Sequence, residues 1–370
     1  MIIFKEINYV CEVNYPNTSA YAIHVAKMCN ALANENQKVN LIVPHSSSGI
    51  KKISNDFNLT NNFNLVTIFK KKKKINFFIR IIFSIYILRE IKSNKENFFI
   101  TRSVMFALIG SLFNRNIVVE LHHELSGFSK IFYNLFTFFK LIQDMKYIFI
   151  HKNLIKKFNI SKNLRIVLDD AVEPNNYKAY KNVEKLKKTC VYIGSFYEGK
   201  GIEIILELAK KLPDYKFHLY GDKKFLPNIV FNKNIKLFKY KTYKYIPKIL
   251  SKYDIALMPY LNKVKARHKT LNISNNMSPL KMFDYLASGM LILATNLKVY
   301  KHILKNEFNS ILINQNKIDD WVWYIKNIKK NKKKFNYIKR NALNTAEKYT
   351  WEKRAKKIKL FAKNFIRKSI

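Results

Sequence analysis

Short apolar runs alternate along the whole chain with longer segments of helical periodicity. Helical patterns such as Ala20–Ala33 and Val104–Phe113 separate the runs. Strands that alternate with helices indicate parallel sheets, so we predict an α/β protein. The predicted strands are Ile7–Val10, Val39–Val43, Phe98–Thr101, Ile117–Leu121, Tyr147–Ile150 and Ile166–Leu168 in the first half, and Val191–Ile193, Lys216–Tyr220, Ile235–Phe238, Ile255–Met258, Leu291–Ala294 and Ile311–Ile313 in the second.

The length of 370 residues fits two domains, each able to bury its own core. The boundary is expected in the polar stretch Asn175–Lys188, which has no apolar periodicity. We predict one doubly wound domain over residues 1–180 and a second over 188–345. A final amphipathic helix over 346–370 is expected to pack back on the first domain. Sheets of this kind bind ligands at the carboxyl ends of their strands, so we expect the two domains to face a central cleft.

The net charge of +43 suggests at first a partner with many phosphates. Only nine of the 68 basic residues are arginine, the side chain that reads phosphates and bases best. The abundant Lys, Asn, Ile, Phe and Tyr all have A/T-rich codons, so we interpret much of the lysine excess as mutational drift on solvated faces. Specific nucleic-acid binding is therefore not expected.

The cysteines and the chain start both favour the cytoplasm. Cys11, Cys29 and Cys190 are scattered and form no CxxC pair, which argues for a reducing compartment without structural disulfides. The start, Met1–Ile7, carries a charge inside its apolar run and no cleavage site of small residues. It therefore does not have the pattern of a signal peptide.

One apolar segment follows a run of five lysines, Lys70–Lys74. The segment Ile75–Leu88 is too short to span a bilayer, which needs about 20 apolar residues, and Arg80 interrupts it. A helix lying in the interface of an anionic membrane would explain residues 70–88, with each lysine contributing roughly 1 kcal/mol. An ordinary core helix after a basic loop is the alternative.

The segment Asn276–Gly289 has the signals of a short helix followed by a buried strand. Ser278 is a suitable N-cap, Pro279 suits the first helical position, and Gly289 suits the position after the helix. Lys281 falls in the first turn, where the helix dipole disfavours a cation by about 0.3–1 kcal/mol. An anion bound at this helix start would reverse that penalty. The alternative is that Lys281 is one more lysine in a lysine-rich protein.

A second segment has the same character. Gly194 ends an apolar run, and Gly199, Lys200 and Gly201 open a helix. The glycines allow a close approach of the backbone to a ligand, and the charge of Lys200 stands against the helix dipole. The spacing fits neither GxxxxGK[ST] nor GxGxxG, so the pattern alone indicates an anion site of unassigned type.

Together these two segments resemble the nucleotide-sugar domain of glycosyltransferase family 4, in its branch with an "SPLK-FDY" pattern. The strand, loop and helix from Val191 to Leu212 are similar to that family's "vGsl…KG…lleaa", and Ser278–Gly289 is similar to "sPlKlfEYmAsG". Tyr15–Leu32 and Val119–His122 join the resemblance more faintly. The resemblance implies the GT-B fold, in which two Rossmann-like domains face a central cleft.

The resemblance also implies roles for single residues. Lys200 corresponds to the lysine that contacts the donor diphosphate, Asp284 to the acidic residue that hydrogen-bonds the donor ribose, and His122 to the histidine near the transferred sugar. These three are the predicted catalytic residues. The predicted donor-binding positions are Gly194, Ser195, Lys200, Ser278, Pro279, Leu280, Lys281 and Asp284.

Three positions depart from the family pattern. Asn276 stands where the family's first acidic residue would face the donor sugar, Asp284 is one methylene shorter than the usual glutamate, and Ser195 replaces an arginine. Arg267 and Lys281 are candidates for supplying the missing charge. The departures motivate an alternative in which the protein is a catalytically impaired partner subunit. A basic nucleic-acid-binding protein is a second alternative.

We expect no metal and no cofactor besides the nucleotide-sugar donor, which is a substrate. His123–Gly127 lacks the second histidine of HExxH, and no DxD triplet occurs. The aromatic run Phe128–Phe139 has the spacing of a core helix, with a lipid-acceptor wall as the alternative.

The sequence thus predicts a cytoplasmic, peripherally membrane-bound glycosyltransferase of the hexosyltransferase type. Its acceptor would be a glycan or a lipid-linked glycan of a surface polysaccharide such as capsule or lipopolysaccharide. Family resemblance implies retention at the anomeric carbon and catalysis without a metal.

Overall fold

The computed structural model describes residues 4–33, 37–60, 62–91, 97–113, 116–180, 183–223, 226, 231–265, 272–328 and 330–363. The chain forms two compact units: unit 1 is Met1–Asp169 with Trp351–Ile370, and unit 2 is Asp170–Thr350. The division falls before the polar stretch in which the sequence predicts it. Val172 pairs with Thr350, and Tyr177 packs into the core of unit 2, so this stretch belongs to unit 2.

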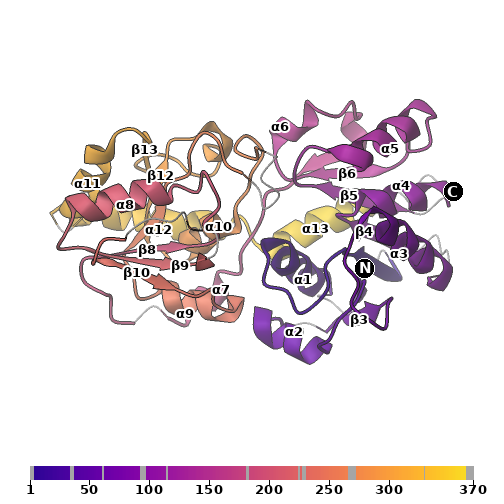
Figure 1. The fold of residues 1–370 in the computed structure, drawn as a ribbon, viewed down its shortest axis with the longest axis horizontal. Helices are drawn as coiled ribbons and strands as arrows, with labels where there is room; N and C mark the ends of the chain where they lie inside the picture. Colours follow the sequence, from indigo (N-terminus) through magenta and orange to yellow (C-terminus); the bar gives the residue numbers. More distant parts are fainter. Residues whose placement is uncertain are drawn as a thin grey trace. The chain divides into compact units, whose positions relative to one another are not determined.

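Unit 1 is built on a parallel sheet of seven strands among the described residues (Figure 1). The chain order reverses between β1 and β4, as in doubly wound folds. All six strands predicted for this half are present, whereas the four-residue edge strand β3 was not predicted. Across the sheet the strands are β3 (Asn64–Thr67), β2 (Lys38–Val43), β1 (Glu6–Val10), β4 (Asn97–Thr101), β5 (Ile117–Leu121), β6 (Lys146–Phe149) and β7 (Arg165–Val167).

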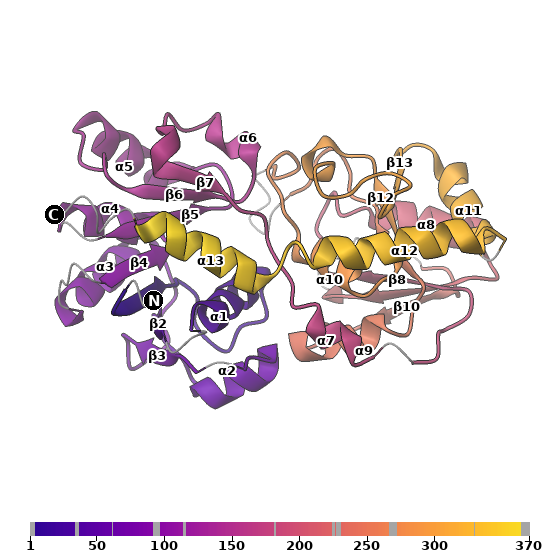
Figure 2. The same ribbon diagram turned by 180° about the vertical axis from the view of Figure 1, so that it is seen from behind.

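Helices cover the sheet of unit 1 in two groups. α3, α4 and α5 pack on one apolar cluster of the strands, whereas α1 contacts α2 and α13. Figure 2 shows α13, the last helix, lying beside α1. No helix among the described residues is long and apolar enough to cross a bilayer. The helices are α1 (Ala20–Leu32), α2 (Ile50–Phe57), α3 (Phe77–Glu90), α4 (Val104–Leu112), α5 (Gly127–Phe138), α6 (Lys152–Ile155) and α13 (Trp351–Ala362).

The aromatic helix α5 is not the core helix that its spacing predicts. Tyr133 is its only buried residue. Phe132 and Phe136 pack partly against the core, while Phe128 and Phe138 are 60% and 78% exposed. The core interpretation is therefore wrong for the outer face of this helix. Helical spacing shows which residues share a face, but not what covers that face.

Unit 2 repeats the architecture with a parallel sheet of six strands among the described residues. Every strand predicted for the second half is present. The chain order reverses between β8 and β11, the two strands at the middle of the sheet. Across the sheet the strands are β10 (Ile235–Phe238), β9 (Lys216–Tyr220), β8 (Thr189–Ile193), β11 (Ile255–Met258), β12 (Leu291–Thr295) and β13 (Ile311–Ile313).

Each face of this second sheet has its own apolar core. One core joins the strands to α9, α10 and the end of α12, and the other joins them to α8, α11 and the start of α12. The helices are α7 (Asn175–Lys178), α8 (Ile202–Lys211), α9 (Ile246–Leu250), α10 (Leu280–Ala287), α11 (Ile318–Asn327) and α12 (Lys332–Ala346).

Candidate functional site

The two segments singled out in the sequence meet at one place in unit 2. The Gly194–Gly201 loop follows β8, and the segment that leads to α10 follows β11. These strands are neighbours in the sheet, and the chain order reverses between them. Doubly wound sheets bind ligands at this switch point, outside the carboxyl ends of the strands.

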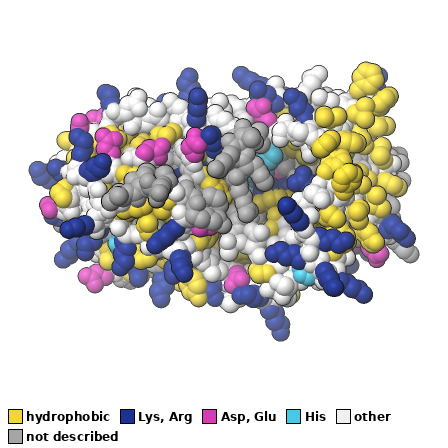
Figure 3. Space-filling view, viewed as in Figure 1, with side chains coloured by type: hydrophobic (Ala, Val, Ile, Leu, Met, Phe, Trp, Pro, Cys, Tyr) yellow, Lys and Arg dark blue, Asp and Glu magenta, His cyan; other side chains and the backbone are white. Residues whose placement is uncertain are grey.

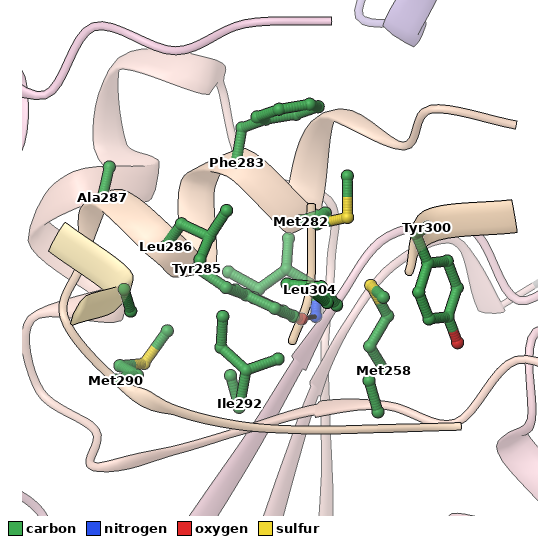
Figure 4. Close-up of a cluster of buried hydrophobic side chains, with 14 of the residues drawn as sticks. Met258, Met282, Phe283, Tyr285, Leu286, Ala287, Met290, Ile292, Tyr300 and Leu304 are labelled. Carbon is green, nitrogen blue, oxygen red and sulfur yellow. Dashed lines mark hydrogen bonds between the residues drawn. The ribbon is translucent and has the colours of Figure 1, made fainter. Parts of the chain in front are cut away.

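Helix α10 is anchored by its apolar face. Met282, Tyr285 and Leu286 point from the helix into the core above Ile292 of β12 (Figure 4). The backbone N–H of Ile193 donates to the Tyr285 hydroxyl at 2.9 Å, which ties the helix to the end of β8. The start of α10 is thereby held beside the glycine loop.

The predicted N-cap of α10 is wrong by one residue. The helix begins at Leu280, so Pro279 occupies the cap position without a side-chain hydrogen bond. The Ser278 hydroxyl instead accepts a hydrogen bond from the backbone N–H of Asp170 at 3.1 Å. Gly289 follows the helix with φ +61°, as predicted. The Met282 N–H donates to the Pro279 carbonyl at 2.9 Å, which leaves the N–H groups of Leu280 and Lys281 as first-turn donors without an acceptor among the described residues.

Two glycines let the loop after β8 lie against the backbone that follows β11. At Gly199 and Gly201 φ is +81° and +78°, and a Cβ would lie 1.9 Å from the carbonyl oxygen of Lys263 and 1.7 Å from that of Pro259. The N–H of Leu261 donates to the Gly199 carbonyl at 2.9 Å. Only glycine fits such a contact.

The Lys281 side chain is half-buried, and its nitrogen is fully buried. This Nζ has no hydrogen-bond partner among the described residues and lies 3.5 Å from the centre of the Tyr192 ring. A Cβ on Gly194 would come within 2.6 Å of this Nζ, so the glycine makes room for it. Burial, and then the charge of Lys200, hold the pKa of Lys281 well below its usual range.

Lys200 is buried beside it. Its Nζ lies 4.4 Å from the centre of the Tyr260 ring, which Lys281 also faces at 5.2 Å. Burial lowers the pKa of Lys200 to about 8. Within the described part of the chain, neither lysine forms a salt bridge. Removing cations from water without a counter-charge is costly, so this pair is suited to binding an anion.

Asp284 lies one turn further along α10 and already has partners. Its Oδ1 accepts hydrogen bonds from the hydroxyls of Tyr177 at 2.7 Å and Tyr243 at 2.8 Å. Burial, and then the charge of Asp284, raise the pKa of both tyrosines, which therefore stay protonated as donors. A carboxylate has further lone pairs, and the ribose role of Asp284 remains a prediction.

The departures from the family pattern lie around the same site. Asn276 is buried, with its N–H bonded to the Ile273 carbonyl at 3.0 Å. The Ser195 carbonyl accepts a hydrogen bond from the Tyr192 hydroxyl at 2.8 Å, which fixes the ring that faces Lys281. Arg267, a candidate for the missing charge, lies outside the described residues.

His122 lies in unit 1, at the carboxyl end of β5, and belongs to a buried cluster around Glu120. Its Nε2 is 2.5 Å from Glu120 Oε1, and His24 Nε2 is 2.9 Å from the same oxygen. Arg354 of α13 donates to that oxygen at 2.8 Å. His122 was predicted, but its partners Glu120, His24 and Arg354 were not. Glu120 precedes His122 by two residues on a strand, so strand periodicity could have indicated that pair.

Three side chains of this cluster could in principle ligate a metal ion. His24, Glu120 and His122 offer ligand atoms that lie within 4.8 Å of one another. The guanidinium of Arg354 already places a positive charge on the shared oxygen. A metal ion would have to approach against that charge, so the donor set does not suit one.

Comparisons with known proteins identify the unit that holds the two lysines. Residues 174–345 match the family model "Glycosyl transferases group 1". This region is therefore similar to group 1 glycosyltransferase domains. A sequence search of curated proteins finds no match.

Solved structures extend the likeness to both units and show the GT-B fold. A glycosyltransferase from Rickettsia africae matches with a TM-score of 0.72 and 14% identity over 98% of this chain and 99% of its own. HepE from Anabaena, solved with UDP and glucose, matches with a TM-score of 0.66 and 11% identity over 96% of this chain and 98% of its own. WaaG, a glycosyltransferase of lipopolysaccharide biosynthesis, matches with a TM-score of 0.63 and 11% identity over 95% of this chain and 98% of its own.

We expect the variant Gly201→Ala to lower the free energy of unfolding of unit 2 by at least about 2 kcal/mol, because a side chain there combines a positive φ with a backbone clash. Chemical denaturation measures the change. Gly49→Ala is the control, since φ is −70° there and nothing lies within 4 Å of the added Cβ. Equal stability of the two variants would contradict the assignment of this contact.

Proposed function

We propose that the protein is a glycosyltransferase that moves a sugar from a nucleotide-sugar donor to a glycan or lipid-linked acceptor. The observation that carries the proposal is the pair of unneutralised, largely buried lysines at the switch point of the second sheet. Lys200 lies in the loop after β8, Lys281 lies in the first turn of α10, and both face the Tyr260 ring. Two cations and free helix N–H groups together match the chemistry of a diphosphate.

The same groups supply what the reaction needs. Cleavage of the bond between sugar and diphosphate places negative charge on the leaving group. Lys200, Lys281 and the first N–H groups of α10 are held in place before that charge develops, so they stabilise it without reorganising. In this proposal Asp284 hydrogen-bonds the donor ribose, and His122 orients the transferred sugar.

The finer parts of the proposal rest on relatives and on family resemblance. HepE was solved with UDP and glucose, and WaaG acts in lipopolysaccharide biosynthesis. We therefore propose a hexose as the transferred sugar and a surface polysaccharide as the product. Retention at the anomeric carbon and catalysis without a metal belong to the same proposal.

We also propose that unit 1 binds an anionic membrane surface, where a lipid-linked acceptor would be found. Apolar side chains on the outer faces of α3 and α5 form one patch in Figure 3. The Phe77 and Phe128 rings, 4.9 Å apart, join the two helices. The exposed apolar residues of these two helices include Phe78, Ile85, Tyr86, Phe128, Ile131 and Phe138.

Basic residues border this apolar patch. Lys70–Lys74 are exposed just before α3, and Lys130 and Lys140 are exposed on and after α5. An apolar surface of this kind with a basic rim fits the interface of an anionic bilayer, where rings enter the headgroup region and lysines meet phosphates.

Lys200→Ala and Lys281→Ala should each weaken binding of nucleoside diphosphates about tenfold or more, since a charge-assisted hydrogen bond contributes about 1.5–3 kcal/mol. Calorimetry with a panel of nucleoside diphosphates, and transfer assays with the matching sugars, measure the effect. Lys210→Ala on α8 is the control, because Lys210 is exposed. If wild type binds a donor but transfers nothing to any acceptor, the impaired-subunit alternative is favoured; if no donor binds, the proposal fails.

Diphosphate binding should weaken as the pH rises above about 8. The lowered pKa of Lys200 means that its ammonium loses the proton, and with it the positive charge, near that pH. Affinity is then expected to fall by up to about tenfold per pH unit, because one proton must be taken up on binding. Lys200→Arg should reduce the slope, since arginine stays charged. Affinity that stays unchanged from about pH 7 to about pH 9.5 would contradict a role for Lys200.

Membrane binding should depend on both the apolar rings and the anionic lipid. The double variant Phe78→Asp/Phe138→Asp is expected to lower the partition onto phosphatidylglycerol-containing vesicles at least about tenfold, because two apolar contacts are lost. Flotation with and without that lipid measures it. Trp323→Asp on α11 is the control, an exposed aromatic residue in unit 2. Binding that ignores the anionic lipid, or a variant that floats like wild type, would refute this surface.

A further inference from the structure

The Glu120 carboxylate of unit 1 is buried and contacts groups from four different elements. Arg354 of α13, His24 of α1 and His122 after β5 all approach its Oε1. The Tyr9 hydroxyl of β1 donates to its Oε2 at 3.3 Å. Contacts from so many elements hold the carboxylate in one orientation.

The ionised state of Glu120 depends on Arg354. Burial alone raises the pKa of this carboxyl, but Arg354, followed by the two histidines, holds the pKa well below its usual range. Arg354 is itself only 4% exposed, and its Nε donates to the Asp169 carbonyl at 2.9 Å. The guanidinium is therefore fixed by the backbone at the end of the first sheet and cannot turn away from the carboxylate.

An ionised carboxylate can only accept hydrogen bonds. The His122 Nε2, 2.5 Å from Oε1, must therefore carry the hydrogen. Burial, and then the charge of Arg102, lower the pKa of His122 to about 3, so the ring is neutral at ordinary pH. In a neutral imidazole with its hydrogen on Nε2, Nδ1 is a hydrogen-bond acceptor.

We propose that Arg354 is a positioning residue for His122: by keeping Glu120 ionised, it fixes His122 as the tautomer with hydrogen on Nε2 and a free lone pair on Nδ1. The inference rests on the proposed function, in which His122 lies beside the transferred sugar. Nδ1 would then accept a hydrogen bond from a sugar hydroxyl, and His122 would not act as a proton donor.

Without the guanidinium, the buried Glu120 would take up a proton. A protonated carboxyl donates, so the His122 Nε2 would become the acceptor and the hydrogen would move to Nδ1. The ring would then offer the sugar a donor where it had offered an acceptor. The charged and titratable groups that face this pair are His24, Tyr9, Arg102 and Arg354.

Nitrogen-15 NMR of histidine-labelled wild-type protein tests the tautomer directly, with His122→Gln to assign the signal. We expect hydrogen on Nε2 and a neutral ring throughout the range from about pH 6 to about pH 9, given the lowered pKa. Hydrogen on Nδ1, or a charged ring, would overturn the inference. This measurement needs no transfer activity, so failure of the proposed function would be seen separately in the donor assays.

Variants extend the test to catalysis. Arg354→Gln should shift His122 toward hydrogen on Nδ1 and lower kcat about 10–100-fold with little change in the donor KM, as a misplaced catalytic contact does. Activity should then rise with pH, as Glu120 ionises again. Arg354→Lys should restore part of the wild-type tautomer and part of kcat. Lys356→Gln is the control, because Lys356 is exposed on the same helix.

A folded Arg354→Gln protein with the wild-type tautomer and pH profile would overturn the role. If that variant does not fold, Glu120→Gln gives a second reading, because an amide both donates and accepts and so no longer enforces one tautomer. We then expect both tautomers of His122 and a lower kcat. A ring wholly protonated on Nε2 together with a wild-type kcat would overturn the role of the ionised carboxylate, and with it that of Arg354.

Discussion

A charge that is removed from water must be compensated, and the two units of this protein meet that constraint in opposite ways. In unit 1 the buried Glu120 carboxylate is compensated by Arg354 and by two imidazoles. In unit 2 the buried ammonium groups of Lys200 and Lys281 have aromatic faces around them but no carboxylate in salt-bridge contact among the described residues. The first arrangement is complete within the protein, whereas the second is complete only with an anion.

The sequence predicted the framework of the second site because that framework depends on local signals. Gly199 and Gly201 adopt positive φ and touch a backbone, which a glycine pattern can indicate. Lys281 falls in the first turn of α10 as predicted. Tyr192 of β8 and Tyr260, just after β11, face the Lys281 nitrogen but lie far from it in the sequence, so no local pattern links them to this lysine.

The first unit shows where prediction from sequence stops. Apolar runs predicted twelve strands, whereas the edge strand β3 was missed although it lies within the largely apolar stretch Phe63–Phe69. The exposed face of α5 has the same spacing as a buried one. Arg354 lies more than two hundred residues from Glu120 and was one of many basic residues in the last helix, so only the fold brings the pair together.

The placement of α13 has a consequence for the order in which the protein is made. Chains fold as they leave the ribosome, and domains near the N-terminus generally fold first. Here the residues that complete unit 1, among them Trp351 and Arg354, are synthesised after the whole of unit 2. Until they emerge, Glu120 lacks its counter-charge, so the unit that is translated first is the one that matures last.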